Sequence, residues 1–504
     1  MRILFVKVCL TKGSSLGGVE NSILEPLEFE YLAGALGGHE LLCLDLRLEP
    51  NDALVNTLAN FQPDVVASTA NTVDVYVVQE LFRTVKALSP NVLTVVGGYH
   101  ATYRPEDFNN PTTDVVVQGP GEIAFRELIE RYQTGKRAFD DILGLMLPRG
   151  GRLFHTGKRP LTGPDMVQPD RGITQKYRRH YHCEFWMPSA MVRNTWGCPY
   201  RCSFCALWNL GEGKLWERDV IRLCDEIEGL KEKYVFFCDD LSFSLTSKSR
   251  MEAFCREVKR RHLRKQFYLT CRSDIVVQCP QLIEKLCDAG MKRVFLGLES
   301  HTDEGQAYWN KHNRICMNEE AIRLLHSHGV SITGSFLVTP DFTPEQFEAL
   351  FRYAQRLDIL CPAFLIYTPH PGVHVHEEKG FKLNTENYEF YDHLHSLFET
   401  SLPLDEFYRR FSELWQRSYS PFSRTGYRRF WNIARRVSLP LIPHTLKMGL
   451  TIFTRMANGS FITERYEEGK MSNSGRPRLA PVEAVPTGNA GHVPESITDN
   501  NSEE

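Results

Sequence analysis

The sequence predicts an α/β protein with an N-terminal Rossmann-like parallel sheet, a partial (β/α)6 barrel and a mainly helical C-terminal region. Two observations predict the sheets: β-rich runs alternate with helical patterns over residues 1–135 and again over 191–385, and this alternation is typical of parallel sheets covered by helices. A third observation, the composition, predicts a globular protein. Of the 504 residues, 42% are hydrophobic and 24% are charged, and this hydrophobic content is enough to form sizeable buried cores. The predicted units are residues 1–135, a linker over 136–190, residues 191–385, a helical region over 386–467 and a disordered tail over 468–504, which is rich in Ser, Gly, Pro and Asn.

The first unit is expected to bind a ligand at one edge of its sheet. Strands are predicted at residues 2–8, 41–47, 64–69, 92–98 and 114–119, with helices over 24–36 and 73–88. Ligands of open parallel sheets bind at the carboxyl ends of the strands, where this chain has the loops 68–72, 97–102 and 119–122. Glycines in these loops would let a bulky ligand approach the backbone. The alternative is that the loops are only tight turns between strands and helices.

The second unit repeats the pattern after the linker, in which a hairpin is expected around residues 148–155. Its strands are predicted at 191–197, 234–238, 267–271, 293–298, 331–338 and 363–367. A helix is expected over 317–328, because Gly329 is a natural helix stop. Catalytic groups of barrel-like folds gather at the carboxyl ends of the strands, so the cysteine-rich segment after the first of these strands is the expected active site.

The C-terminal region has an unusual charge pattern. Residues 414–463 contain no Asp or Glu, whereas basic and aromatic residues recur through them. A basic amphipathic segment of this kind can lie at an anionic membrane surface. The alternative is a helical face that packs on an acidic neighbouring domain.

Net charge and hydropathy exclude some partners and locations. The formal net charge is −3 at pH 7, which predicts no nucleic-acid binding. The first residues have no small-residue cleavage site, so no signal peptide is expected. No window has the ~18 uninterrupted apolar residues that a membrane-spanning helix needs. We therefore expect a cytoplasmic protein, at the inner face of the membrane if residues 414–463 bind lipid.

Three cysteines within "NTWGCPYRCSFCALW", residues 194–208, have the spacing of metal ligands. They are Cys198, Cys202 and Cys205, in the pattern C-x3-C-x2-C. A structural zinc site needs four ligands, typically as two separated pairs, and no second pair follows at a finger-like distance. An iron–sulfur cluster held by three thiolates instead leaves one iron open for a substrate or cofactor. The spacing favours such a cluster over zinc and over three unrelated buried thiols.

This motif resembles that of the radical S-adenosylmethionine (SAM) superfamily, which also has an aromatic residue, here Phe204, just before the last cysteine. The resemblance implies that the three cysteines hold a [4Fe–4S] cluster and that its open iron binds the amino and carboxylate groups of SAM.

The resemblance also assigns roles at three later strand ends. It implies that Asp239 or Asp240 approaches the methionine amino group, that Arg272 pairs with the methionine carboxylate, and that Glu299 hydrogen-bonds the ribose. Taken singly, the carboxylates could equally be helix N-caps and Arg272 a surface ion-pair partner.

The first unit resembles the cobalamin-binding domain of B12-dependent radical enzymes, through "VVGGYHATYRPEDF" and "VVVQGPGEIAF". The resemblance implies that cobalamin is bound by Ser68, Thr69, Gly97, Gly98, His100, Gly119, Gly121 and Glu122. The D-x-H-x-x-G motif, which supplies an axial histidine in other cobalamin proteins, is absent after the first strand. His100 is the nearest candidate, on a different loop, so the axial ligation of cobalt stays open.

Most enzymes with this pairing of domains are methylases that use a one-electron reductant and methylate an unactivated carbon. Residues 23–47 and the C-terminal "PLIPHTLKMGLTIF" are most similar to the hopanoid C-3 methylases, so the expected substrate is a hydrophobic small molecule, a hopanoid lipid. The C-terminal region also resembles the anaerobic magnesium-protoporphyrin monomethyl ester cyclases, which perform an oxidative ring closure. A third possibility is a non-catalytic protein that senses cobalamin or redox state.

Overall fold

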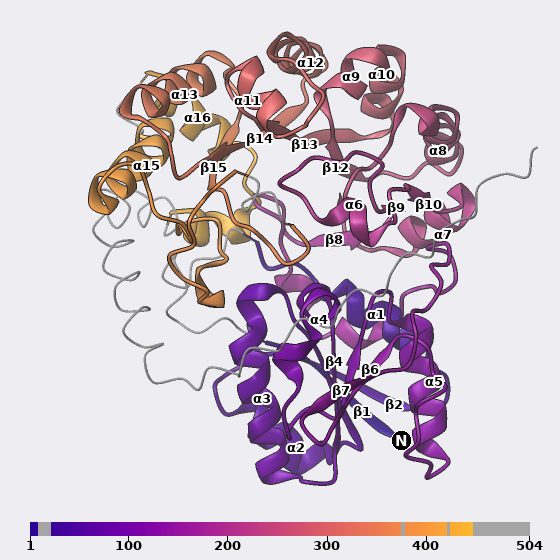
Figure 1. The fold of residues 1–504 in the computed structure, drawn as a ribbon. Coiled ribbons are helices and arrows are strands. Elements are labelled where there is room, and N and C mark those ends of the chain that lie inside the picture. The colour runs from indigo at the N-terminus through magenta and orange to yellow at the C-terminus, as the bar shows by residue number, and fades with distance from the viewer. Residues whose placement is uncertain (9–21, 374–378, 421–423, 447–504) are drawn as a thin grey trace, which may run out of the picture.

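The computed structural model describes residues 1–8, 22–373, 379–420 and 424–446, and Figure 1 shows two α/β domains followed by C-terminal helices. The predicted fold class is confirmed: the N-terminal domain has its own largely parallel sheet, and the larger core has a second, fully parallel one. The predicted disordered tail over 468–504 and the last part of the basic segment 414–463 lie outside the described residues.

The N-terminal sheet has seven strands in the order β2-β1-β3-β4-β5-β6-β7. Its five parallel strands are β1 (Arg2–Lys7), β2 (Glu40–Asp45), β3 (Val65–Thr69), β4 (Leu93–Gly97) and β5 (Val115–Val117). Between them run α1 (Leu27–Gly34), α2 (Ala53–Phe61), α3 (Val75–Leu88), the short α4 (Tyr99–Tyr103) and, after β5, α5 (Glu122–Gln133).

Alternating side chains of β1 bury both faces of this sheet. Ile3 and Phe5 pack in one apolar cluster with residues of α1 and α5, whereas Leu4 and Val6 pack in another with residues of α2 and α3. Successive strand residues point to opposite faces, so a strand that is apolar throughout needs helices on both sides.

The predicted hairpin in the linker belongs to the N-terminal sheet, which corrects the expected domain boundary at residue 135. It forms β6 (Leu145–Arg149) and β7 (Arg152–His155), and β6 pairs antiparallel with β5 through Val116 and Met146. The alternation of strands and helices stops before this hairpin, so the sequence pattern gave no sign that it extends the sheet.

The core sheet has six parallel strands in the order β15-β14-β13-β12-β11-β8. They are β8 (Ser189–Val192), β11 (Tyr234–Phe237), β12 (Gln266–Cys271), β13 (Met291–Glu299), β14 (Ser331–Val338) and β15 (Cys361–Ile366). A ribbon of β9 (Thr195–Trp196) and β10 (Trp216–Glu217) stands beside the sheet. The strand order follows the chain order, as a partial barrel built from successive βα units requires.

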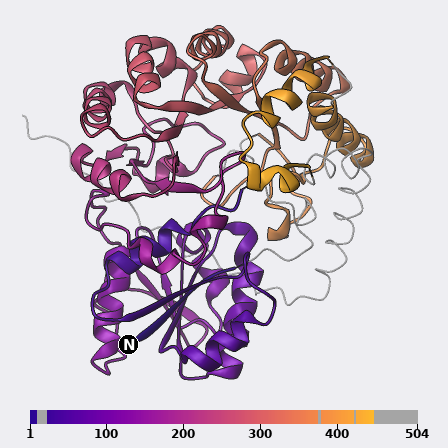
Figure 2. The same ribbon diagram turned by 180° about the vertical axis from the view of Figure 1, so that it is seen from behind.

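Helices cover the outer side of the core sheet, as Figures 1 and 2 show from two sides. They are α7 (Val220–Gly229), α8 (Lys248–Arg260), α9 (Ser273–Gln278), α10 (Pro280–Ala289), α11 (Asp303–Tyr308), α12 (Ile315–Ser327) and α13 (Pro344–Arg356). The short α6 (Leu207–Leu210) does not belong to this layer and lies beside β9. Local sequence sets several ends. The α13 helix starts with a capping box between Thr343 and Gln346, and α10 ends at Gly290, which has a φ of 118°.

The C-terminal region adds α15 (Leu404–Tyr419) and α16 (Arg424–Ala434). Phe407, Phe411 and Leu414 of α15 are buried in the hydrophobic core of the second domain, so α15 is part of that domain. Single 3-10 turns occur at Thr72–Asp74, Pro105–Phe108, Arg171–Thr174, Arg178–His180, Leu245–Ser247, Tyr388–Phe390 and Leu439–Leu441. Within the described part of the chain, no helix has the length and apolar character needed to cross a membrane.

Buried ion pairs join the two domains. Glu25, just before α1, accepts hydrogen bonds from Arg171 at 2.7 Å and Arg178 at 2.8 Å, and it also accepts one from the backbone N–H of Met191 in β8. Arg171 reaches on to Glu226 of α7. One carboxylate of the N-terminal domain is thereby tied to the connecting segment and to the first strand of the core.

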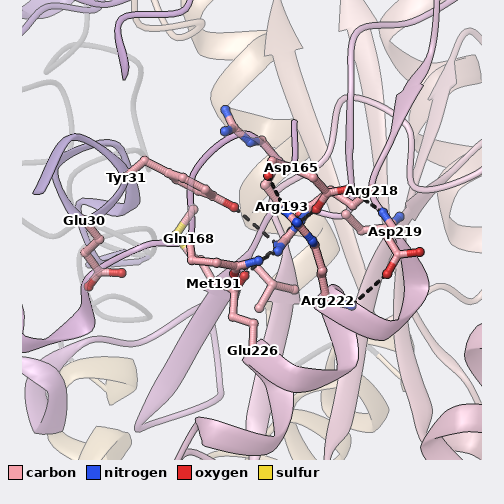
Figure 3. A network of polar contacts seen from close by, with 12 residues as sticks. Glu30, Tyr31, Asp165, Gln168, Met191, Arg193, Arg218, Asp219, Arg222 and Glu226 are labelled. Carbon is pink, nitrogen blue, oxygen red and sulfur yellow. Dashed lines mark hydrogen bonds and ion pairs between the residues drawn. The ribbon is translucent and has the colours of Figure 1, made fainter. Parts of the chain in front are cut away.

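Arg218 forms a second part of this contact (Figure 3). Its fully buried side chain donates to Glu226 at 2.6 Å and to Asp165 at 3.0 Å. It also contacts the hydroxyl of Tyr31 in α1 at 3.4 Å. The guanidinium therefore links α1, the connecting segment and α7.

Replacement of this buried cation tests the contact. We expect Arg218→Met to lower the free energy of unfolding by about 1–3 kcal/mol, because the buried Glu226 would keep only Arg171 as a partner and Asp165 would lose its contact with the guanidinium. The measurement is the urea unfolding transition. The matched control is Arg323→Met, which breaks an exposed ion pair with Glu320 and should cost less than about 1 kcal/mol. Equal losses in the two variants would contradict the assignment.

Candidate active site

The three cysteines lie on one loop that follows β8 and β9. Cys202 is buried, and Cys198 and Cys205 are half-buried. Cys202 affects the pKa of Cys198, and both of these cysteines affect the pKa of Cys205, so the loop brings the three sulfurs into one region. The core holds the loop from outside, because the backbone N–H of Ser203 donates to the carbonyl of Trp309 at 3.0 Å.

The loop suits a cluster better than a single ion. Among the residues that the structure describes, no three His, Cys, Asp or Glu side chains converge closely enough for one metal ion. A [4Fe–4S] cluster does not require such convergence, since each thiolate binds a different iron. Burial raises the pKa of Cys198 to about 11 and that of Cys205 to about 12, and it also raises the pKa of Cys202. The metal-free thiols are thus protonated at neutral pH, and cluster binding must release protons.

Asp239 and Asp240 follow β11 and have different environments. Asp239 is buried and accepts hydrogen bonds from the backbone N–H groups of Asn194 at 2.8 Å and Thr195 at 2.9 Å. Asp240 accepts one from the backbone N–H of Gly197 at 2.9 Å, and burial raises its pKa to about 6. Asp239 therefore anchors the segment that leads into the cysteine loop. Of the two carboxylates proposed for the methionine amino group, Asp240 is the better placed.

Arg272 contacts the cysteine loop directly. Its guanidinium stacks 3.8 Å from the ring centroid of Tyr200 and lies 3.8 Å from the sulfur of Cys202. It is held by Asp274 through bonds of 3.0 and 3.1 Å. A methionine carboxylate would have to compete with Asp274 for the N–H groups of this guanidinium. The contacts therefore favour Arg272 as a residue that positions the cysteine loop.

Glu299 ends β13 as predicted but has a partner that the sequence did not indicate. The ammonium of Lys311 contacts the carboxylate of Glu299 at 2.5 Å and donates to the carbonyl of Gly297 at 2.7 Å. The carbonyl of Lys311 accepts from Arg272 at 2.7 Å. Lys311 is 4% exposed and thus connects two of the predicted site residues. It belongs to no motif, and its role depends on a fold-back of the chain after α11.

The glycine-bearing loops of the N-terminal domain meet at the carboxyl edge of its sheet. The N–H of Ala70 donates to Gly97 at 2.9 Å, and the N–H of His100 donates to Ala70 at 3.0 Å. Gly98 has a φ of 99°, and a Cβ there would lie 2.4 Å from the hydroxyl of Thr69. A Cβ on Gly119 would have no atom within 4 Å. The edge is therefore tightly packed at Gly98 and open at Gly119, an arrangement that fits a bulky ligand such as cobalamin.

Three of the residues expected to bind cobalamin have other partners. His100 is fully buried, with its ring nitrogens 2.8 Å from Asp107 and 3.3 Å from Thr72, so neither nitrogen is free to bind cobalt. The hydroxyl of Ser68 donates to the carbonyl of Val6. Glu122 pairs with Arg193 of the core at 2.9 Å. Gly121, another residue expected to bind cobalamin, is the N-cap of α5.

Two tyrosines of α4 connect the expected cobalamin edge to the core domain, and one of them bonds to the cysteine loop. The hydroxyl of Tyr103 donates to the carbonyl of Ala206, next to Cys205, at 3.2 Å, and that of Tyr99 donates to Pro371 at 2.6 Å. Gly372 lies against Tyr103, where a Cβ would come within 2.6 Å of the ring. Both tyrosines belong to the segment VVGGYHATYRPEDF, but nothing in the sequence indicated that they lie toward the core domain.

Comparisons with known proteins agree with this two-domain site. The B12 binding domain family matches residues 14–129, and the Radical SAM superfamily matches residues 195–354. These domains bind the expected cofactors, cobalamin in the first and a [4Fe–4S] cluster with SAM in the second. With both domains present, the chain is an enzyme, and the expectation of a non-catalytic sensor is set aside.

Curated relatives and solved structures cover most of the chain. The hopanoid C-3 methylase of Methylococcus capsulatus is 29% identical over 76% of this chain and 74% of its own. The anaerobic magnesium-protoporphyrin IX monomethyl ester cyclase of Cereibacter sphaeroides is 28% identical over 85% of this chain and 73% of its own. The fold resembles that of the cobalamin-dependent SAM radical enzyme OxsB, with a TM-score of 0.65 and 14% identity over 95% of this chain and 82% of that one. It also resembles the methyltransferase TsrM from Kitasatospora setae, with a TM-score of 0.63 and 19% identity over 93% and 99% of the two chains.

The Lys311–Glu299 pair can be tested in the metal-free protein. We expect Lys311→Met to lower the free energy of unfolding by about 3–5 kcal/mol, because the Glu299 carboxylate would be left buried and unpaired. The double variant Lys311→Met/Glu299→Gln removes both charges and should regain most of this loss. Thermal and urea unfolding give the comparison. If the double variant is no more stable than Lys311→Met, the two charges do not stabilise each other.

Proposed function

We propose, from the premise that this chain belongs to the cobalamin-dependent radical SAM enzymes, that it is a methyltransferase and that its acceptor is C-3 of a hopanoid. The observation that carries the reaction class is the contact between α4, at the cobalamin edge, and the cysteine loop through Tyr103. The similarity to a hopanoid C-3 methylase over three quarters of both chains supports the substrate.

In this proposal the residues divide into ligands and positioning groups. Cys198, Cys202 and Cys205 hold the cluster, beside Phe204, while Asp240 and Glu299 face SAM. Thr69, Gly97, Gly98, Gly119 and Gly121 form the floor under cobalamin. Asp239, Arg272, Ser68, His100, Glu122 and Lys311 act through the backbone or through other side chains. When bound, the cluster and SAM supply a carbon radical that removes hydrogen from an unactivated carbon, and cobalamin carries the methyl group.

The protein's own contribution is alignment and exclusion of water. The rings of Phe204 and Trp309 lie 5.6 Å apart, and those of Trp309 and Tyr367 lie 4.9 Å apart, so aromatic side chains back the cysteine loop. His370 lies near α4, with its ring 6.2 Å from that of Tyr99. Burial and the neighbouring His393 lower the pKa of His370 to about 3, which keeps this imidazole neutral. Such a dry surrounding protects a reactive radical, and removal of hydrogen from an sp3 carbon needs no general base.

A hopanoid has to be reached at a membrane, and one face of the C-terminal region suits this. Tyr427, Phe430 and Trp431 of α16 are 56%, 44% and 46% exposed, and Leu439 is 81% exposed. Arg435 and Arg436 lie beside them and are exposed as well. Aromatic and aliphatic side chains next to arginines favour the interface of an anionic bilayer.

Other arginines of the same segment bond to the protein, as expected if the segment packs on an acidic neighbouring domain. Arg429 is 3% exposed and donates to three backbone carbonyls. Arg417 pairs with Glu348, and Arg428 pairs with Asp358. The proposal therefore assigns only the exposed face of α16 and residues 439–446 to the membrane.

The first test is a lipid analysis. The chain is expressed with supplied cobalamin in a host that makes hopanoids but no 3-methylhopanoids. New hopanoids one methylene heavier are expected, and Cys202→Ala should make none, because the cluster would lose a ligand. If no methylated hopanoid forms while the purified protein still converts SAM to 5′-deoxyadenosine, the substrate assignment is wrong and a porphyrin is tested next. A fully active Cys202→Ala variant would contradict the cluster assignment.

The second test concerns the membrane face. We expect Phe430→Ser/Trp431→Ser to weaken binding to vesicles that contain anionic phospholipid by about tenfold, because two exposed aromatic side chains no longer enter the interface. Co-flotation with the vesicles measures this. The control is Phe154→Ser/Met166→Ser, which removes two exposed apolar residues elsewhere, 43% and 60% exposed. Equal binding by all three proteins would exclude this face.

A further inference from the structure

The outer surface of the cysteine loop carries a small basic platform, formed by Arg201, Trp208, Lys214 and Trp216. Arg201 and Lys214 are exposed, and the two tryptophans are half-buried. The guanidinium of Arg201 lies 5.3 Å from the ring centroid of Trp208, and the ammonium of Lys214 lies 5.7 Å from that of Trp216. Each cation is thus supported by an aromatic face. Arg201 immediately precedes Cys202, so the platform includes a residue of the cysteine loop itself.

The platform is held in place by close backbone packing. A Cβ on Gly197 would lie 2.5 Å from the carbonyl of Lys214 and 2.8 Å from the Cα of Gly211, so the start of the cysteine loop touches the segment that carries Lys214. The side chain of Asn310 donates to the carbonyl of Arg201 at 2.9 Å. A Cβ on Gly213 would lie 3.8 Å from the guanidinium of Arg201. The two cations therefore belong to one preformed surface.

Among the described residues, no carboxylate lies within ion-pair distance of either cation of the platform, and Glu212 lies near enough to attract Lys214. Glu212 itself pairs with Lys158 at 2.6 Å, so its attraction for Lys214 is shared with a second cation. This contrasts with the arginines between the domains, which are paired with carboxylates. Two exposed cations without a direct ion pair, beside two tryptophans, have the composition of a protein-binding surface, in which Arg and Trp are enriched.

We propose that this basic platform is the docking surface for an acidic one-electron carrier protein that reduces the cluster. The inference rests on the proposed cluster at Cys198, Cys202 and Cys205. In the step, the carrier gives up one electron and the cluster accepts it, with no bond made or broken. Complementary charge steers such an encounter and raises its rate, and the position of Arg201 next to a cluster ligand would bring the carrier close to the cluster.

The test compares two reductants on the reconstituted, cobalamin-loaded enzyme. The probe is flavodoxin hydroquinone, an acidic one-electron carrier, and the small-molecule reference is dithionite. We expect Arg201→Glu/Lys214→Glu to slow reduction of the cluster by flavodoxin about tenfold or more at low salt, because charge reversal removes the steering. The difference should vanish near 1 M salt, where the Debye length falls to about 3 Å. Reduction by dithionite, whose reducing species is a small anion with a single charge, should be slowed much less than reduction by flavodoxin. Bleaching of the cluster absorbance is the readout.

The matched control is Arg264→Glu/Lys292→Glu, which reverses an exposed Arg and an exposed Lys at the amino ends of β12 and β13. It should keep the rate of the unchanged protein with both reductants. Equal flavodoxin rates in all three proteins at low salt would overturn the proposal. If Arg201→Glu/Lys214→Glu does not assemble a cluster, Arg201→Gln/Lys214→Gln decides in its place, with a smaller expected loss in the same direction.

The outcome is separable from that of the proposed function. Cluster bleaching does not depend on any methyl acceptor, so the docking surface can be confirmed even if no hopanoid is methylated. Conversely, a protein that forms 5′-deoxyadenosine with dithionite but shows no charge dependence with flavodoxin keeps its proposed chemistry and loses only the docking surface.

Discussion

The buried ionic contact between the two domains is the constraint on which the active site depends. The cobalamin edge is built on one sheet and the cysteine loop on another, so their separation is set by whatever fixes the domains to each other. Glu25 is tied at once to Arg171, Arg178 and the backbone of β8. Buried ion pairs contribute little net stability compared with apolar packing, but a broken pair is costly. Such a contact therefore favours one geometry, which a reaction between two bound cofactors requires.

Within that geometry, polar groups behind the cysteine loop hold its backbone rather than a ligand. Asp239 is bonded to the segment before the loop, Trp309 accepts from Ser203 inside it, and Tyr103 reaches Ala206 at its end. Each bond satisfies a group that would otherwise be buried without a partner. The loop is thus positioned from three directions, by β11, by the segment after α11 and by the other domain. Three thiolates on so short a stretch of chain can then present a fixed arrangement of sulfurs.

The features that could be predicted from the sequence are those encoded locally. The six core strands and the helices between them follow from runs of apolar residues and from stop signals such as Gly329, and the cysteine spacing indicates a cluster without any knowledge of the fold. The side-chain roles were harder, because they depend on partners far away in the chain. His100 is satisfied by Asp107 and Thr72, and Glu122 by Arg193 of the other domain. The alternation of strands and helices also does not predict that the linker hairpin pairs with β5.

The basic C-terminal segment shows why composition alone leaves two interpretations open. A run without acidic residues is compatible both with a membrane surface and with an acidic neighbour, and the structure divides the segment between them. Arg417 and Arg428 meet carboxylates of the core, while Phe430 and Trp431 remain exposed on the same helix as the buried Arg429. Successive positions on a helix point about 100° apart, so neighbours in the sequence can serve opposite surfaces. The arginines that fix α16 to the core thereby determine which aromatic side chains face outward, and a lipid-facing surface of this kind would need that rigid support.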